Sequence, residues 1–201
     1  MNDSTACTRP RFRTWLALPL LLSLACTAEA RRDRQIRASI RSSVVWIRQD
    51  PGSPATRQAI ATSWGLLLQQ FPDQAFTVST TLESLDREWP LAVQEGRPCL
   101  VAFAPRTVRG RGGGWQWTTT FWELAGHPAT LDEMKPRIIS PMGEELGFPP
   151  GSSGIPGGAY YIQPFDQGRH DWWCAGDHRG SAVTLTYWYQ RGRVESRTKL
   201  E

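Results

Sequence analysis

Residues 157–190 read GGAYYIQPFDQGRHDWWCAGDHRGSAVTLTYWYQ and place two strand-like runs around a polar loop. The runs at 159–162 and 182–189 are rich in β-branched and aromatic residues, which is the composition of strands in a half-buried sheet. A cysteine, two histidines and three aspartates lie between them. Two interpretations are open here: a metal or catalytic cluster, or a disulfide-tied loop in a secreted β domain.

Further strand-like runs precede this stretch. Residues 36–46 alternate apolar and polar positions with period two, which predicts a half-buried strand. Residues 76–82, 99–103 and 115–122 have the composition of strands as well. The sequence therefore predicts short strands along most of the chain.

One segment has helical spacing instead. Ser53 and Pro54 form an N-cap and first-turn pair, and the apolar residues from Ile60 onward recur at i, i+4, i+7 and i+8. We expect a helix that begins at Pro54 and that Pro72 closes. Six strands with one helix predict a mainly β fold, an antiparallel Ig-like sandwich with a short helical insertion.

The N-terminus has the layout of a secretory signal peptide. Arginines precede an apolar run at 15–25, and Ala28-Glu29-Ala30 is a small-x-small cleavage site. The run is too short to span a bilayer. We expect residues 1–30 to be a cleaved signal peptide, residues 31–201 to form a single domain, and the protein to be secreted. Lipid attachment at Cys26 or a retained anchor is the alternative.

Charge and cysteine content narrow the class of protein. The formal net charge is only +4 at pH 7 and its acids and bases are interspersed, which argues against a nucleic-acid partner. Without the signal peptide the chain keeps Cys99 and Cys174. In an oxidising compartment one disulfide is the simplest arrangement, and closing so long a loop contributes about 3–5 kcal/mol. Two unpaired buried thiols are the alternative.

A metal site is the second choice for the loop at 163–181. His170, Cys174 and His178 are spaced i, i+4 and i+8, which on a helix would put three zinc ligands on one face. The Trp172-Trp173 pair and nearby glycines disfavour a helix, and a disulfide would occupy Cys174. No nucleophile elbow accompanies the aspartates. We therefore expect no catalytic residue, no metal and no cofactor.

A basic glycine loop at 106–114 leads into a Trp-rich strand. The loop lacks the Gly-Lys-Ser/Thr of a phosphate-binding loop, and no helix follows it. Residues 135–158, rich in Pro and Gly, are expected to form an exposed excursion. Arg and Trp side chains are the usual anchors of binding surfaces. The residues expected to bind a partner are Arg106, Arg109, Arg111, Trp115 and Trp117.

Several stretches resemble one viral family. Tyr160-Tyr-Ile-Gln-Pro164, Trp173-Cys-Ala175 and Tyr187-Trp188 look like the middle of the receptor-binding domain of gammaretrovirus-type envelope surface subunits. Residues 76–99 are similar in layout to that family's stretch ending in a Trp-Pro region and a Cys. The chain departs from the family at Gln163, which stands where a Cys is expected, and it lacks the Ser-Pro-His-Gln and Cys-x-x-Cys motifs and the fusion peptide.

The resemblance implies a secreted or virion-surface domain that binds a host membrane receptor or transporter. It implies attachment or receptor interference through the loops between Cys99 and Tyr160, with no fusion activity by itself and no membrane insertion after signal cleavage. An envelope partner subunit is a further candidate partner. The alternative is a secreted β-rich interaction or structural protein unrelated to envelopes, and the third choice is a zinc enzyme at His170, Cys174 and His178.

Overall fold

The computed structural model describes residues 17–71, 80–104, 107–110, 113–147, 149 and 160–201, with the backbone alone for 17–27. The chain divides into two compact units, 1–35 and 36–201, and the boundary falls inside the first helix. The described elements are α1 (Ala17–Gln49), α2 (Pro54–Gln70), α3 (Leu82–Glu95), β1 (Leu100–Phe103), β2 (Val108–Arg109), β3 (Trp115–Glu123), β4 (Ala129–Ile139), β5 (Glu145–Leu146), β6 (Tyr160–Ile162), β7 (Gln167–Cys174), β8 (Ala182–Tyr189) and β9 (Gly192–Lys199).

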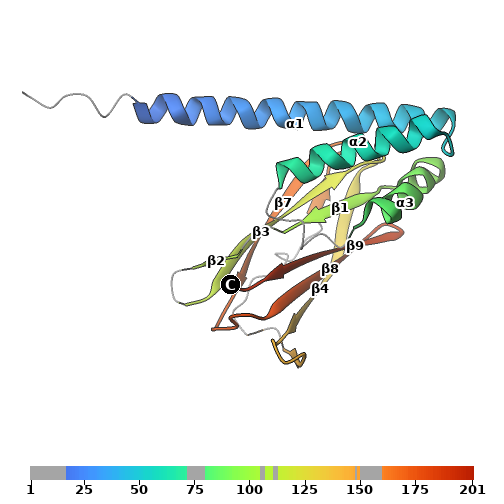
Figure 1. The fold of residues 1–201 in the computed structure, drawn as a ribbon. Coiled ribbons are helices and arrows are strands. Elements are labelled where there is room, and N and C mark those ends of the chain that lie inside the picture. Colours follow the sequence, from blue (N-terminus) through green and yellow to red (C-terminus); the bar gives the residue numbers. More distant parts are fainter. Residues whose placement is uncertain (1–16, 72–79, 105–106, 111–112, 148, 150–159) are drawn as a thin grey trace, which may run out of the picture. The chain divides into compact units, whose positions relative to one another are not determined.

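The strands form two antiparallel sheets (Figure 1). In the first sheet β7 pairs with β3 from Trp115 to Trp122, so β1 and β2 share the other edge of β3. In the second sheet β4 pairs with β8, and β8 pairs with β9. The short strands β5 and β6 pair with the two ends of β4.

The sandwich core lies between the two sheets. Alternate residues of each strand point into it because successive side chains of a strand face opposite sides. From β8 these are Val183, Leu185, Tyr187 and Tyr189, and from the first sheet they include the buried tryptophans of β3 and β7. The predicted mainly β fold, an antiparallel sandwich with a helical insertion, is confirmed.

A second apolar core joins helices to the other face of the first sheet. Leu100 and Ala102 of β1 point into the sandwich, whereas Cys99, Val101 and Phe103 point to the helices. All four residues of β1 are buried, as expected for a strand covered on both faces. The helical part is therefore larger than the single predicted helix.

The predicted strand at 36–46 is wrong, because this segment belongs to α1. Ile36, Ile40 and Val44 are buried at every fourth position, a spacing that fits a period of two and a helix alike. Ile47, buried three residues after Val44, fits only the helix. Trp46, which the strand pattern placed with the buried set, is 43% exposed.

The helix predicted from Pro54 is confirmed as α2. The Ser53 hydroxyl accepts a hydrogen bond from the Thr56 N–H at 3.1 Å, so it is the N-cap. The helix α3 was not predicted. Its capping box pairs Thr81 with Ser84, and its C-cap is Gly96 at φ +63°. Leu82, the last residue of the predicted strand at 76–82, is the first residue of α3, and 76–79 lie outside the described residues.

The strands predicted at 99–103, 115–122, 159–162 and 182–189 are present as β1, β3, β6 and β8. The predicted excursion at 135–158 begins inside β4, and its residues 148 and 150–158 lie outside the description. Part of the predicted polar loop is the strand β7. Residues 1–16 are also outside the description, so the signal peptide stays a prediction.

No helix in the described part of the chain has the length and apolarity needed for a membrane span.

Candidate functional site

A pocket of about 370 Å³ lies between α3 and the β8–β9 hairpin, within the size range of small-molecule sites. Three arginines, two hydroxyls and one carboxylate give it its polar groups: Arg97, Arg191, Arg193, Thr80, Ser84 and Glu88. The rest of the lining is mostly apolar: Leu85, Cys99, Leu100, Tyr189, Gly192 and Val194. None of the three arginines is among the residues that the sequence predicts to bind a partner.

The hairpin turn holds Arg191 in an unusual backbone conformation. Tyr189 pairs with Gly192, so only Gln190 and Arg191 connect β8 to β9. Arg191 has a φ of +58°, in the left-handed region that normally favours glycine. The Tyr189 hydroxyl accepts a hydrogen bond from the Leu100 N–H at 3.3 Å. This bond fixes the end of the hairpin against β1.

Arg97 is the most buried of the three arginines, with a side chain only 13% exposed. Its guanidinium donates to the carboxylate of Glu95 and, at 3.4 Å, to that of Glu88. Burial lowers the pKa of Arg97, but the two carboxylates outweigh burial and raise it above the ordinary value. Arg97 is therefore a fixed positive charge at this pocket.

Arg191 and Arg193 are exposed, and no ion pair in the described part of the chain involves either of them. Guanidinium groups bind carboxylates and phosphates through paired N–H donors, and neighbouring hydroxyls can add further bonds. The pocket is therefore suited to an anion.

The thiol and the phenol of the pocket, Cys99 and Tyr189, are buried and hold their protons. Burial, with the Glu123 charge, raises the pKa of the Cys99 thiol to about 12. Burial also raises the pKa of Tyr189 above its ordinary value. Neither side chain supplies a nucleophile or a base near neutral pH.

The structure places the predicted binding residues differently from the expectation. Trp115 and Trp117 are buried in the sandwich core and cannot contact a partner, which corrects their predicted role. Arg109 is partly exposed, lies 5.0 Å from the Trp115 ring and forms an ion pair with Asp177 at 2.6 Å. Arg106 and Arg111 lie outside the described residues.

The predicted disulfide between Cys99 and Cys174 is wrong, since both cysteines are free and buried. Cys174 pairs with Trp115 at one end of β3, whereas Leu100, next to Cys99, pairs with Glu123 at the other end. Eight residues of extended strand cover about 27 Å. A disulfide needs Cα atoms within about 7 Å of each other.

The second-choice metal site at His170, Cys174 and His178 is also wrong. His170 and Cys174 both lie in β7, where four residues span about 13 Å, too far for a shared ion. The ring of His170 instead packs at a tilt of 45° against Trp172, with centroids 4.6 Å apart. Among the described residues, no three or more His, Cys, Asp or Glu side chains are grouped to hold a metal.

The aspartates of the loop also have structural partners. Asp166 forms an ion pair with Arg37 at 2.6 Å, and Asp171 accepts a hydrogen bond from the Thr118 hydroxyl at 2.7 Å. Asp177 forms the ion pair with Arg109 noted above. An acid–base pair of an aspartate with a histidine is therefore not supported.

A buried carboxylate joins the sheet to a neighbouring loop. The side chain of Glu123 accepts hydrogen bonds from four backbone N–H groups, those of Cys99, Ala125, Gly126 and Phe165, at 2.8–3.3 Å. Burial raises the pKa of Glu123, while the four donors lower it. All four partners are backbone groups, which is the arrangement of a structural acceptor.

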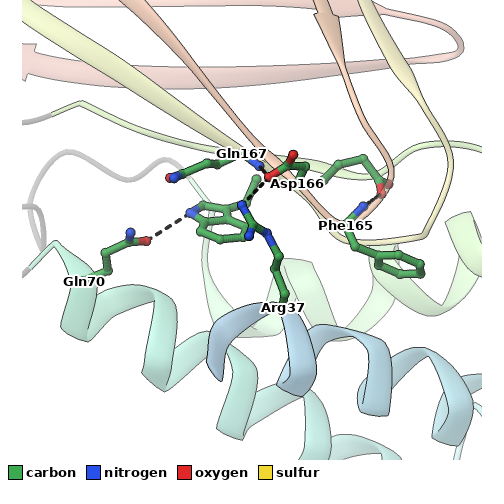
Figure 2. Close-up of polar contacts among 7 residues, drawn as sticks. Arg37, Gln70, Phe165, Asp166 and Gln167 are labelled. Carbon is green, nitrogen blue, oxygen red and sulfur yellow. Dashed lines mark hydrogen bonds and ion pairs between the residues drawn. The ribbon is translucent and has the colours of Figure 1, made fainter. Parts of the chain in front are cut away.

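The helices α1 and α2 contact the first sheet near Glu123, where β3 ends and β7 begins (Figure 2). Arg37 of α1 points to Asp166, which also accepts a bond from the Gln167 N–H at 2.8 Å. Gln70 of α2 accepts a bond from the indole N–H of Trp122 at 3.0 Å. These contacts tie the helical layer to the ends of β3 and β7.

Three of the residues that carry the envelope resemblance, Tyr160, Trp173 and Tyr187, have packing roles. The Tyr187 hydroxyl accepts a bond from the buried indole of Trp172 at 2.9 Å. Trp173 covers Gly110 and Gly114, where an added Cβ would meet its ring at 2.3–2.5 Å. The Tyr160 hydroxyl bonds the backbone N–H and C=O of Arg169.

Comparison with known proteins finds a distant structural similarity. No family model and no curated protein matches it. One similar solved structure is a Northeast Structural Genomics Consortium target, 15% identical, covering 52% of this chain and 81% of its own, with a TM-score of 0.32. A similarity this low assigns neither family nor function.

Proposed function

We propose that this protein is a non-enzymatic binding domain that takes an anionic ligand in the pocket between α3 and the β8–β9 hairpin. The observation that carries the proposal is the convergence of Arg97, Arg191 and Arg193 on one pocket. Among the described residues, Glu88 and Glu95 pair with Arg97 alone, and like charges repel, so Arg191 and Arg193 gather beside it most favourably where a further anion neutralises them.

The backbone of Arg191 supports the proposal. A non-glycine residue in the left-handed region costs roughly 1–2 kcal/mol. Glycine would avoid that cost at a φ of +58°. A strained arginine at the mouth of a pocket is explained if its side chain binds something.

Glu88 supports the proposal in a different way. Its carboxylate lies 3.4 Å from the Arg97 guanidinium, yet its side chain is 62% exposed. The Arg97 side chain is largely buried, but water screens the Glu88 carboxylate, and a pair screened in this way and as long as 3.4 Å contributes only about 1 kcal/mol to stability. A ligand anion that binds Arg97 more tightly can therefore displace the Glu88 carboxylate at small cost in free energy. Glu88 then competes with the ligand for Arg97.

Attachment to a host membrane receptor, with secretion, remains what the envelope resemblance implies. Support for that hypothesis is weaker than for the pocket, because Tyr187 and the two proposed Trp anchors are core residues. An anion-binding domain agrees better with the alternative, a secreted β-rich interaction protein unrelated to envelopes.

Titration calorimetry with inorganic phosphate tests the proposal. Each guanidinium bond to an anion contributes about 1.5 kcal/mol, so Arg193→Gln should weaken phosphate binding about tenfold. Arg191→Gly should weaken binding similarly while leaving the domain as stable or more stable. Glu88→Gln should strengthen binding.

The matched control is Arg197→Gln, which removes an exposed arginine of β9 that does not line the pocket. This control should bind phosphate within about twofold of the wild-type protein. The proposal is wrong if the wild-type protein does not bind phosphate, or if Arg197→Gln loses as much affinity as Arg193→Gln.

A further inference from the structure

The outward face of the helical layer carries an excess of positive charge. Residues 36–70, which hold the end of α1, the turn and α2, contain four arginines, no lysine and a single acidic residue, Asp50. Arg37 is neutralised by Asp166. No ion pair in the described part of the chain involves the other three, Arg41, Arg48 and Arg57.

An uncharged groove of about 370 Å³ lies between the two helices. Small and uncharged side chains line most of it, among them Ser39, Ser42, Ala55, Ala59 and Thr62. The hydroxyls of Ser39 and Ser43 bond the Ser63 hydroxyl at 2.8 and 2.9 Å. These hydroxyls are therefore engaged in the contact between the helices.

Two large apolar side chains stand exposed beside this groove. Trp46 lines the groove and is 43% exposed, and its neighbour Val45 is 53% exposed. Neither belongs to the apolar core between the helices and the sheet. Trp side chains favour the boundary between water and lipid, because the ring is apolar and its N–H is polar.

The basic residues flank this apolar strip. Arg41 and Arg48 are seven residues apart, so they lie on one stripe of α1, about 60° or less from Val45 around the helix. Arg41 lies over the Phe165 ring at 5.4 Å, and Arg57 of α2 donates to the Gly52 carbonyl at 3.0 Å. Long arginine side chains at the edge of an apolar strip can reach the phosphates of a lipid surface while Trp46 enters the interface.

We infer that this face docks on an anionic lipid surface. The inference does not rest on the anion pocket, which lies on other elements. Charge complementarity favours lipid, because three arginines without an ion pair in the described part of the chain outnumber the single acidic residue of 36–70, Asp50, around the exposed Trp46. A second copy of the chain is disfavoured, since two such faces would repel.

Vesicle flotation with the full chain tests the inference. The readout is the ratio of affinities for phosphatidylcholine vesicles with and without phosphatidylserine, in which any apolar contribution common to both vesicles cancels. Each arginine near an anionic surface changes affinity about fivefold. Replacing Arg41, Arg48 and Arg57 together by Gln should lower this ratio about a hundredfold.

A matched control removes the same charge elsewhere: Arg87→Gln, Arg179→Gln and Arg197→Gln are exposed positions off this face. The control variant should lower the ratio by no more than about fivefold. Equal losses in the two variants would overturn the inference, as would no preference of the wild-type chain for phosphatidylserine. Binding of polyglutamate without any vesicle preference would assign the face to an acidic protein and overturn it as well.

Discussion

Replacing Glu123 by Gln tests its role as the buried acceptor that joins the first sheet to the neighbouring loop. Glu123 is fully buried, and one carboxylate oxygen accepts from the N–H groups of Cys99 and Ala125. The other oxygen accepts from Gly126 and Phe165. Glutamine has nearly the same shape, but one of its two terminal atoms is an NH₂ donor.

The variant should lose about 4 kcal/mol of unfolding free energy. Whichever way the amide of Gln is turned, its NH₂ group faces two backbone N–H donors. Those two donors lose their acceptor, and each unsatisfied buried donor costs about 1–3 kcal/mol. For a domain of this size each kcal/mol shifts Tm by about 2–4 °C, so Tm should fall by about 10 °C.

Urea denaturation followed by circular dichroism measures this loss. The matched control is Glu145→Gln, an exposed carboxylate that pairs with Arg137 and should change stability by less than about 1 kcal/mol. If Glu123→Gln stays within about 1 kcal/mol of the wild-type protein, the four-bond acceptor role is refuted.

Three further outcomes follow from buried thiols and tight glycines. Cys99 should react with a thiol reagent at pH 8 only after unfolding, and rapid labelling of the native protein would contradict its burial. The folded pKa of Cys99 is raised to about 12, so above pH 9 the thiol loses its proton in the unfolded state but keeps it in the folded state. This difference lowers the unfolding free energy of the wild-type protein as the pH rises from 9 to 10. Cys99→Ala lacks the thiol, so its unfolding free energy should fall by up to about 1.4 kcal/mol less over the same range. Gly126→Ala should cost about 3 kcal/mol, because a Cβ would lie 2.3 Å from the Phe165 ring. Gly143→Ala, with almost the same φ and open space, should cost only about 1 kcal/mol by the same denaturation assay.

Strand composition predicted four of the nine described strands, β1, β3, β6 and β8, since the preference for β-branched and aromatic residues is local to each segment. The runs at 100–103 and 182–189 needed no knowledge of their partners. The strand β9 was missed because Gly192–Lys199 alternates charged residues with Val, Ser and Thr. Only its pairing with β8 makes it a strand.

The helical layer was harder to predict, although the signals were present. In α3 the buried residues Leu85, Trp89, Ala92 and Val93 recur at i, i+4, i+7 and i+8. Pro90 lies within that pattern and reads as a helix breaker. In α1 the apolar residues at every fourth position fit the two-residue period of a strand as well as the 3.6-residue period of a helix, so the segment was predicted to be a strand.

The candidate pocket could not have been found from local patterns. Arg97 follows a helix, while Arg191 and Arg193 lie in a hairpin about ninety residues later. Nothing in the sequence marks Arg191 as left-handed, because the glycine expected at such a turn is its neighbour, Gly192. The disulfide prediction failed for a similar reason: the register along β3 places the two cysteines at opposite ends of the strand.

Burial of the first sheet on both faces limits where this protein can bind a partner. The side chains of β1 and most of β3 are used in the two cores, so an aromatic-rich strand here indicates packing. The pocket lies where α3 of the helical layer meets the β8–β9 hairpin of the second sheet. An anion bridging Arg97 and Arg193 would link these two layers directly. Its binding should therefore raise the stability of the whole domain by mass action.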